Sequence, residues 1–415
     1  MNEFRFLHAA DLHLDSPMRG LEADPDAPAQ LLRGASRAAF RNLVDAAIEE
    51  QVAFMVIAGD LYDGDWQDWG TGHFFTEQAA KLVDAGIPLV IAAGNHDAAS
   101  VITRHLRLPD GVTLLPHDRC GRVVFEDRGV AIHGQSFANR SVSDNLTRNY
   151  PNAVPGLLNI GLLHTALTGR PGHDPYAPTT VETLAAKGYH YWALGHVHAR
   201  EIVQQDPWIV FPGNLQGRQI RECGPKGASL VTVRGGHVIA VDHRPFDILR
   251  WCAVEVPLAS ERDLDGAMAR VGQALSSSLE AAEGRPVAAR VTLTGVTPLH
   301  GELIGEADRV RQGVIAEGRQ HGADAVWIES VVVATASAAD LEGLRDRPDV
   351  IGRFSKVLDE LIGEMGPDLL GEYPERLRHR LPGIELPLKH PLRQGGPELL
   401  KRARELVLAR LTGEV

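Results

Sequence analysis

The sequence is poor in cysteine and in positive charge, and it lacks any long apolar segment. Its three cysteines, Cys120, Cys223 and Cys252, are an odd number without a C-x-x-C pair. This pattern argues against a disulfide framework and predicts a reducing, cytoplasmic location. No run of about 18 apolar residues occurs, and the first residues lack a signal-peptide pattern. We therefore expect no membrane-spanning helix and no membrane partner.

The shortage of positive charge limits the classes of partner. The chain has 42 Lys and Arg residues against 54 Asp and Glu residues, which gives a net charge of -12. Such a chain has no bulk attraction for nucleic acid. A nucleic-acid partner would need a local basic patch, or metal ions that neutralise the acidic side chains.

The 415 residues, 44% of them hydrophobic, are enough for two or three domains. Up to residue 245, apolar runs alternate with stretches of helical spacing, which predicts βαβ units and a mainly parallel central sheet. We expect strands at residues 4–10, 53–58, 88–93, 157–163 and 191–194, and helices at residues 27–51 and 71–86. The pattern then predicts a small α+β domain over residues 246–336, with its second helix at 299–321, and a helical C-terminal region over residues 337–415.

Polar side chains follow five of the apolar runs, at the point where each expected strand ends. They form the motifs D-x-H, G-D, G-N-H-D, a lone histidine and G-H-x-H, in that order. Ligands of α/β proteins bind at the carboxyl ends of strands, so these side chains are expected to meet at one edge. The candidate metal ligands are Asp11, His13, Asp60, Asn95, His164, His196 and His198.

This mixture of imidazole and oxygen donors suits manganese, iron or zinc, and the absence of thiolates argues against a structural zinc site. Seven ligands are too many for one four-coordinate ion but reasonable for two ions with open positions. Asp60, central in the set, is the natural bridge between them. His96 follows Asn95 directly and can serve as a general acid or as a charge stabiliser for a leaving oxygen.

Two basic stretches stand out in this acidic chain. Arg218, Arg221 and Lys226 lie among glycines, and they form either a rim that contacts phosphate or a solvated loop. Residues 375–410 contain nine Arg or Lys against four Glu. A helix beginning near Pro397 would carry one apolar face, which either packs on its own chain or docks a partner.

The order of the motifs resembles the calcineurin-like metallophosphoesterase superfamily, and the forms G-N-H-D and G-H-V-H resemble its SbcD-like DNA repair exonuclease branch. Residues 8–17, HAADLHLDSP, and residues 59–66, GDLYDGDW, are similar to the bacterial YhaO subgroup. The specific motifs cover residues 1–245, and the rest of the chain matches in layout only. The implied fold is an α/β fold. It comprises a metallophosphoesterase β-sandwich flanked by helices, a small α+β capping domain and a helical C-terminal tail.

The resemblance also implies a chemistry and a set of partners. One metal ion, usually manganese in this family, would be held by Asp11, His13, Asp60 and His198. The other would be held by Asp60, Asn95, His164 and His196. His96 would act on the leaving group with support from Asp97, and the reaction would be phosphodiester hydrolysis by a DNA exonuclease or endonuclease in DNA repair. The implied partners are DNA, an SbcC-type coiled-coil ATPase bound through the C-terminal region, and a second copy of the chain.

One position departs from the family pattern. SbcD-like relatives often carry a histidine three residues after the bridging aspartate, where this chain has Asp63. An acid beside a scissile phosphate would repel it, so either Asp63 points away or substrate handling differs. Asp15 and Asp65 add further negative charge nearby.

Two other functions are compatible with the same residues. The metal site recognises only phosphate, so the substrate could instead be a small nucleotide or another phosphoester. The chain could also be a non-catalytic scaffold of a larger repair complex, although the intact ligand set and His96 argue against this.

Overall fold

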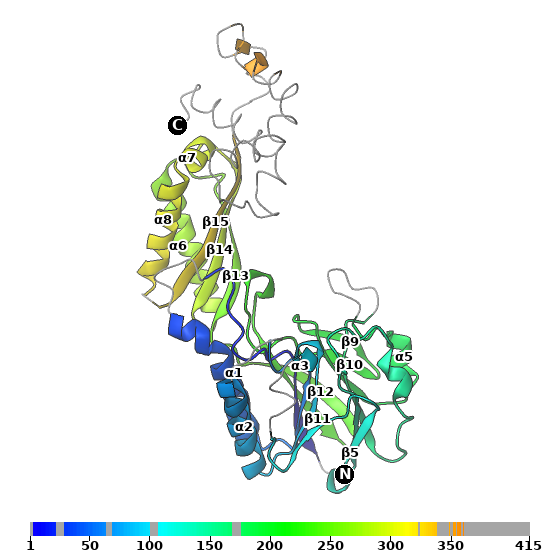
Figure 1. The fold of residues 1–415 in the computed structure, drawn as a ribbon. Coiled ribbons are helices and arrows are strands. Elements are labelled where there is room, and N and C mark those ends of the chain that lie inside the picture. Colours follow the sequence, from blue (N-terminus) through cyan, green and yellow to red (C-terminus); the bar gives the residue numbers. More distant parts are fainter. Residues whose placement is uncertain are drawn as a thin grey trace, which may run out of the picture. The chain divides into compact units, whose positions relative to one another are not determined.

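The structure of the chain is a computed structural model. It describes residues 3–21, 29–63, 69–99, 107–167, 176–322 and 324–337, with short stretches between 348 and 360. The chain divides into two compact units, one of residues 1–252 with 282–288, and one of residues 253–281 with those from 289 onward (Figure 1). Most of residues 338–415 lie outside the described residues, so the division into three domains stays a prediction.

The first unit is built from two six-stranded sheets. The first sheet has the order β12-β11-β1-β2-β3-β4. Its strands are β1 (Phe4–Ala9), β2 (Met55–Ala58), β3 (Leu89–Ala92), β4 (Val112–Leu114), β11 (Gly227–Arg234) and β12 (His237–Pro245). β1 to β4 run parallel to one another, whereas β11 pairs antiparallel with both β1 and β12.

The second sheet has the order β5-β6-β7-β8-β10-β9. Its strands are β5 (Gly121–Phe125), β6 (Val130–Gly134), β7 (Leu158–His164), β8 (Tyr191–Gly195), β9 (Glu201–Gln205) and β10 (Trp208–Phe211). Its four central strands, β6, β7, β8 and β10, are parallel, and the two edge strands β5 and β9 are antiparallel to their neighbours. Each sheet therefore has a parallel centre.

A single central sheet, predicted from the alternation of strands and helices, is wrong. Alternation shows that strands are parallel, but it does not show which sheet each strand joins. The sandwich flanked by helices, which the resemblance implied, is confirmed. The short strands β4 and β9 were not predicted, because partly or fully exposed side chains leave them without a continuous apolar run.

An apolar core fills the space between the two sheets. Phe6 of β1 stacks on Phe54 at 4.8 Å between ring centres and meets Tyr191 of β8 edge-on at 5.4 Å. Val56 of β2 and Ile160 of β7 are fully buried in the same cluster. Since successive side chains of a strand point to opposite faces, a strand buried on both faces is apolar throughout, as β2 is.

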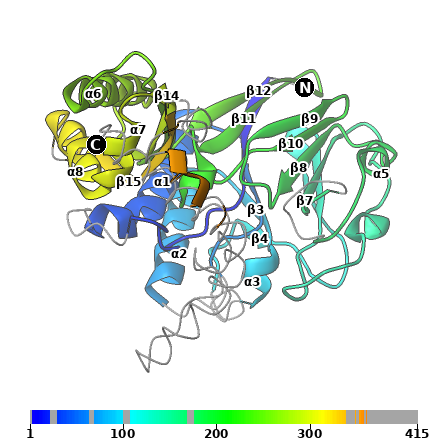
Figure 2. The ribbon, with the colours of Figure 1, turned by 90° about the horizontal axis from the view of Figure 1, so that it is seen from above.

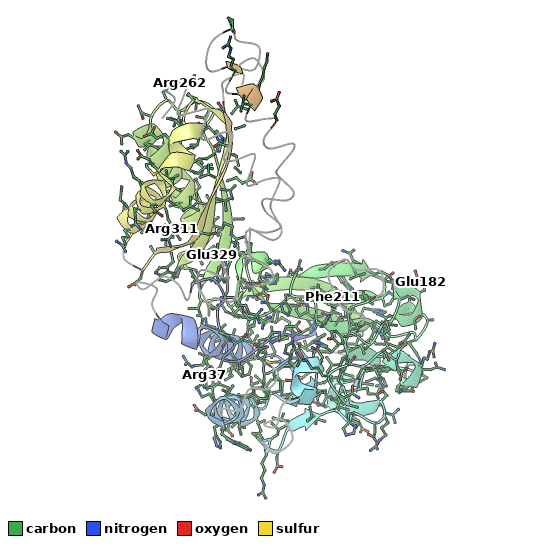
Figure 3. All side chains as sticks on the ribbon, turned by 45° about the horizontal axis from the view of Figure 1, so that its top comes forward. Arg37, Glu182, Phe211, Arg262, Arg311 and Glu329 are labelled. Atoms are coloured by element: carbon green, nitrogen blue, oxygen red, sulfur yellow. The ribbon has the colours of Figure 1, made fainter. Side chains whose placement is uncertain are left out.

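Helices cover the outer faces of both sheets. α1 (Ala29–Glu49) and α2 (Trp69–Asp84) lie side by side against the first sheet (Figure 1). Leu43 of α1 and Phe75 of α2 are fully buried there. The second sheet is covered by the short helix α5 (Val181–Ala185) (Figure 2). Leu184 of this helix lies in the same buried cluster as Trp192. Figure 3 shows Phe211 of β10 inside this unit and Glu182 of α5 at its surface. The remaining short elements are α3 (Asn95–Ala99), η1 (Glu126–Arg128), η2 (Leu146–Asn149) and η3 (Ile220–Glu222).

The second unit is a three-stranded sheet with helices on one face. The strands are β13 (Arg250–Pro257), β14 (Val287–Thr297) and β15 (Val326–Ser337), in that order. The helices are α6 (Leu264–Ala281), α7 (His300–Gly305) and α8 (Ala307–Gln320), and α6 and α8 lie side by side (Figure 2). The prediction of a single helix over residues 299–321 is wrong. Glu306, with φ -116° and ψ 39°, interrupts the helical backbone between α7 and α8.

Spanning a bilayer takes about 20 consecutive apolar residues. None of the helices that the structure describes is both long and apolar enough to do so.

Candidate metal centre

The seven candidate ligands lie together where the two sheets end. Asp11, Asp60 and Asn95 follow the neighbouring parallel strands β1, β2 and β3. His13 also follows β1, whereas His164, His196 and His198 come from the second sheet, at the ends of β7 and β8. Main-chain hydrogen bonds join the strand ends, since the Asp11 amide donates to the Gly59 carbonyl at 3.0 Å. The ligands were predicted to meet at one edge of a single sheet, but they lie at a junction between two sheets.

Two glycines allow the sheets to approach so closely. A Cβ atom at Gly195 would lie 1.8 Å from the carbonyl oxygen of Ala58, across the junction. Gly59 has a φ of +91°, and a Cβ there would lie 2.3 Å from the ring of His164. Any side chain at either position would push β8 or His164 away from β2. The glycines of the G-D and G-H-x-H motifs are therefore required by packing.

Four of the ligand residues have a left-handed backbone. The φ angles of Asp11, His13, Asp60 and His196 are 52°, 42°, 54° and 95°. Residues other than glycine rarely adopt such angles, and they occur mainly at functional sites that surrounding structure holds in place. The left-handed turns thus lie at the ligand residues themselves, where the chain leaves β1, β2 and β8.

The first group of ligand atoms combines the two sheets. The Nε2 atoms of His13 and His198 are 3.2 Å apart, and Asp11 Oδ1 lies 4.0 Å from His198 Nε2. All three residues offer atoms within 4.8 Å of one another. Two imidazole nitrogens that face each other this closely fit a shared cation.

The second group lies on the other side of Asp60. His164 Nε2 is 2.9 Å from Asn95 Oδ1 and 3.5 Å from Asp60 Oδ2, and His196 completes the group. The same Asp60 oxygen lies 3.9 Å from His13 Nε2 in the first group. Because one carboxylate oxygen faces both groups, Asp60 can bridge two ions.

Burial and charge fit this donor set to divalent cations. Burial, followed by the charge of Asp60, raises the pKa of the Asp11 carboxyl well above its ordinary value. Burial lowers the pKa of His13 and of His164. The neutral imidazoles of His13 and His164 and the crowded carboxylates of Asp11 and Asp60 are nearly inaccessible to water. Metal ions bind such groups, and the positive charge of an ion stabilises the buried carboxylates. The residues present therefore fit two divalent ions.

His96 is a partly exposed residue of the centre, and Asp63 holds it. The side chain of His96 is 28% exposed, and its Nδ1 lies 3.1 Å from Asp63 Oδ1. Burial opposes the charged imidazole, but the Asp63 interaction and the charge of Asp60 outweigh it and raise the pKa of His96. Asp63 also accepts a hydrogen bond from the Ser16 hydroxyl at 2.9 Å. Asp63, at the position where SbcD-like relatives often carry a histidine, is thus engaged by neighbouring side chains.

Asp97 ties together the loops that carry the ligands. Its carboxylate accepts hydrogen bonds from the main-chain amides of Leu61, Tyr62 and Gly94, at 2.8, 3.1 and 2.9 Å. Burial and the charge of Asp60 nevertheless raise the pKa of Asp97 to about 7. Asp97 therefore holds the strand ends that present Asp60 and Asn95.

Comparison with known proteins agrees with this site. The family model of the calcineurin-like phosphoesterases matches residues 4–200, and that of the middle domain of metallophosphoesterase YhaO matches residues 251–336. A protein of Bacillus subtilis (strain 168) named "Uncharacterized metallophosphoesterase YhaO" is 33% identical over 304 residues, which are 72% of this chain and 73% of that protein. The chain belongs to the calcineurin-like metallophosphoesterase family. It is a metal-dependent hydrolase of phosphoesters, of the YhaO type.

This metallophosphoesterase is also similar to two proteins that are each named "DNA double-strand break repair protein Mre11". The protein of Sulfurisphaera tokodaii is 25% identical over 256 residues, 57% of this chain and 61% of that protein. The protein of Methanopyrus kandleri is 26% identical over 215 residues, 47% of this chain and 44% of that protein. These similarities are weaker and cover less of the chain.

The three residues of the predicted basic rim lie in different surroundings. Arg218 reaches the metallophosphoesterase centre, with its guanidinium 3.2 Å from Ser16 Oγ and 3.4 Å from His198 Nδ1. Arg221 is exposed. Lys226 is buried, and its ammonium group donates to the carbonyl of His198 at 2.8 Å. Lys226 thus supports the main chain of a ligand, so only Arg218 and Arg221 are left as rim candidates.

Asp15 does not add free negative charge to the centre. Arg37 of α1, labelled in Figure 3, donates to both of its carboxylate oxygens, at 2.7 and 2.6 Å. The hydroxyl of Thr71 on α2 donates to the same carboxylate. These contacts tie the loop after β1 to both helices. Asp65 lies outside the described residues.

Several residues of the centre were missed by sequence reasoning. The rings of Phe137 and Tyr176 pack edge-on against His164 and His196, at 5.4 and 5.3 Å between ring centres. Glu222 is 2.8 Å from His198 Nδ1. Burial opposes its ionisation, but the His198 hydrogen bond and the Arg218 charge outweigh this and lower the pKa of Glu222 to about 2. No motif marks these three residues, because their contacts are formed only by the fold.

Asp60→Asn is expected to reduce the occupancy of both metal positions, because the Asp60 carboxylate faces both groups of ligand atoms. His13→Ala is expected to affect mainly the position that His13 shares with His198. Manganese equivalents per chain, counted by atomic emission after gel filtration, check this difference. Equal losses in the two variants would contradict the bridging role of Asp60.

Proposed function

We propose that this metallophosphoesterase is a DNA nuclease that hydrolyses phosphodiester bonds with two manganese ions. Asp11, His13 and His198 would hold one ion, Asn95, His164 and His196 the other, and Asp60 both. The observation that carries the proposal is the junction of the two sheets, where all seven donors converge beside His96 and Arg218. Such ions supply an activated water molecule and positive charge at the phosphate.

The side chains around the ions have separate tasks in this mechanism. His96 is exposed enough to reach substrate, and its pKa is raised, so it can give a proton to the leaving oxygen. Asp63 fixes the imidazole through Nδ1 and leaves Nε2 for that transfer. Arg218 can donate to a phosphate oxygen, since its side chain is 18% exposed at the edge of the centre.

Two features support DNA as the substrate over a small phosphoester. The chain is similar to the two Mre11 proteins, whose names assign them to the repair of DNA double-strand breaks. Residues 375–410 are basic within an acidic chain, which suits a polyanionic substrate, although they lie outside the described residues. The small-phosphoester alternative remains an outcome of the assay below.

His96→Ala is expected to lower DNA hydrolysis by about 10²–10⁴-fold, because the leaving oxygen loses its proton donor. The assay incubates the protein with manganese and labelled duplex or single-stranded DNA, beside a small bis-phosphodiester. Metal content is the control, because His96 also lies within reach of His13 and Asp60, and it should equal that of the unsubstituted chain. Turnover of the small substrate alone would overturn the assignment to DNA.

Arg218→Gln is expected to weaken DNA binding and to reduce the slope of log K against log salt by about 0.9, the effect of one lost phosphate contact. Fluorescence anisotropy at several salt concentrations measures both quantities. Arg234→Gln is the matched control, since Arg234 of β11 pairs with Glu3 away from the site. Its neighbour Val233 pairs with Phe4 at the start of β1, whereas the ligands follow the end of that strand. Equal slopes for Arg218→Gln and the unsubstituted chain would remove Arg218 from the interface.

The partners implied by the resemblance also stay proposals. We infer that residues 337–415 dock an SbcC-type coiled-coil ATPase, supported by the apolar face that the sequence predicts after Pro397. We further propose that two chains pair. Light scattering on the full chain is expected to give the mass of two chains, and the mass of one chain would contradict pairing.

A further inference from the structure

Glu222 is a buried carboxylate that belongs to no motif, yet it contacts a ligand of the metal centre. It ends η3 and is 5% exposed. Its Oε1 lies 2.8 Å from Nδ1 of His198. Its Oε2 accepts hydrogen bonds from the Arg218 amide at 2.7 Å and the Asn214 side-chain amide at 2.9 Å. Both oxygens are therefore used.

The segment between β10 and β11 wraps around His198 to place Glu222 there. The Asn214 amide and the Lys226 ammonium group both donate to the His198 carbonyl, at 3.3 and 2.8 Å. Asn214 itself is fully buried. The main chain and the ring of His198 are thus both held by one segment, residues 212–226, which follows the G-H-x-H motif in the sequence.

We propose that Glu222 is a positioning residue for metal binding, which holds the His198 ring through Nδ1 and turns Nε2 toward the ion. A histidine whose Nδ1–H donates to a carboxylate presents Nε2 as a fixed, more basic ligand. His13 Nε2, 3.2 Å from His198 Nε2, marks the direction of that ion. The inference uses the two-ion site of the proposed function but not its substrate.

The other ion position is built differently, which makes the inference testable. There, Nδ1 of His164 faces the carbonyl of Ala58 at 2.9 Å, so a neutral main-chain group orients the ring. Loss of Glu222 should weaken ion binding at the position that His198 would hold and leave ion binding at the position of His164 unchanged. If Glu222 only stabilised the fold of residues 212–226, its loss would instead lower the thermal stability of the metal-free protein.

The competing explanation is an ion pair between Glu222 and Arg218 that only stabilises the turn. Their closest charged atoms are 3.6 Å apart, whereas the carboxylate lies 2.8 Å from the His198 ring. The shorter contact is with the ligand. Arg218 is fixed by the same carboxylate through its main-chain amide, so Glu222 links the ligand and the basic side chain at the edge of the centre.

The test titrates manganese into metal-free, full-length protein and follows free Mn²⁺ by electron paramagnetic resonance, without DNA. The unsubstituted chain is expected to bind two equivalents. Glu222→Gln is expected to bind one of them about 10–100-fold more weakly, with the other unchanged. The thermal midpoint of the metal-free protein should stay the same, because glutamine keeps the size of the side chain.

Glu329→Gln is the matched control. Glu329 (Figure 3) is 10% exposed and paired with Arg290 in the second unit, so its loss removes a similar ion pair without touching the metal ligands. Wild-type affinity for both equivalents in Glu222→Gln would overturn the proposal. So would equal weakening of both equivalents together with a lowered thermal midpoint.

A second measurement needs no variant of Glu222. Long-range ¹H–¹⁵N spectra of the metal-free chain report which ring nitrogen of His198 carries the proton, with His198→Gln identifying the signal. We expect the Nδ1–H form, and the Nε2–H form would overturn the proposal. Neither the manganese titration nor the spectra use substrate. Both can therefore be interpreted even if the protein does not hydrolyse DNA.

Discussion

The close approach of β2 and β8 is the constraint on which the rest of the site depends. The Ala58 carbonyl, at the end of β2, faces Gly195 of β8 and Nδ1 of His164. Only a residue without a Cβ fits there, and only then do ligands from both sheets come within reach of Asp60. The apolar core between the sheets and the glycines at their ends therefore serve one geometry, since a shift of either sheet would separate the two groups of donors.

The acidic charge of the chain is compensated locally. Asp15 is neutralised by Arg37, Asp63 faces His96 and Arg218, and Glu222 contacts His198. Asp11 and Asp60 remain buried without a Lys or Arg partner in the described residues, and divalent ions would supply the opposite charge. A chain of net charge -12 can thus accommodate a phosphate group. The acidic side chains nearest the centre either contact Arg or His side chains or would bind the metal ions.

Much of the fold was predictable, because alternating apolar runs and helical spacing mark strands and helices directly. α1, β2 and β3 lie where the sequence placed them within a few residues. The pairing of strands was not predictable in the same way. A parallel strand can join either of two sheets, so one central sheet was predicted where two exist. The break at Glu306 between α7 and α8 was also missed, since apolar spacing continues across it.

By itself, the sequence determined the chemistry of the centre: the donor types of all seven candidate ligands and their positions at strand ends. That information is local, since each motif directly follows its strand. Only the tertiary structure decided how Asp63, Lys226 and Glu222 are used. Asp63 meets His96, and Lys226 and Glu222 meet His198, each across 24 to 33 residues of chain. Such contacts depend on how the loops fold back at the junction of the sheets, and no spacing in the sequence encodes them.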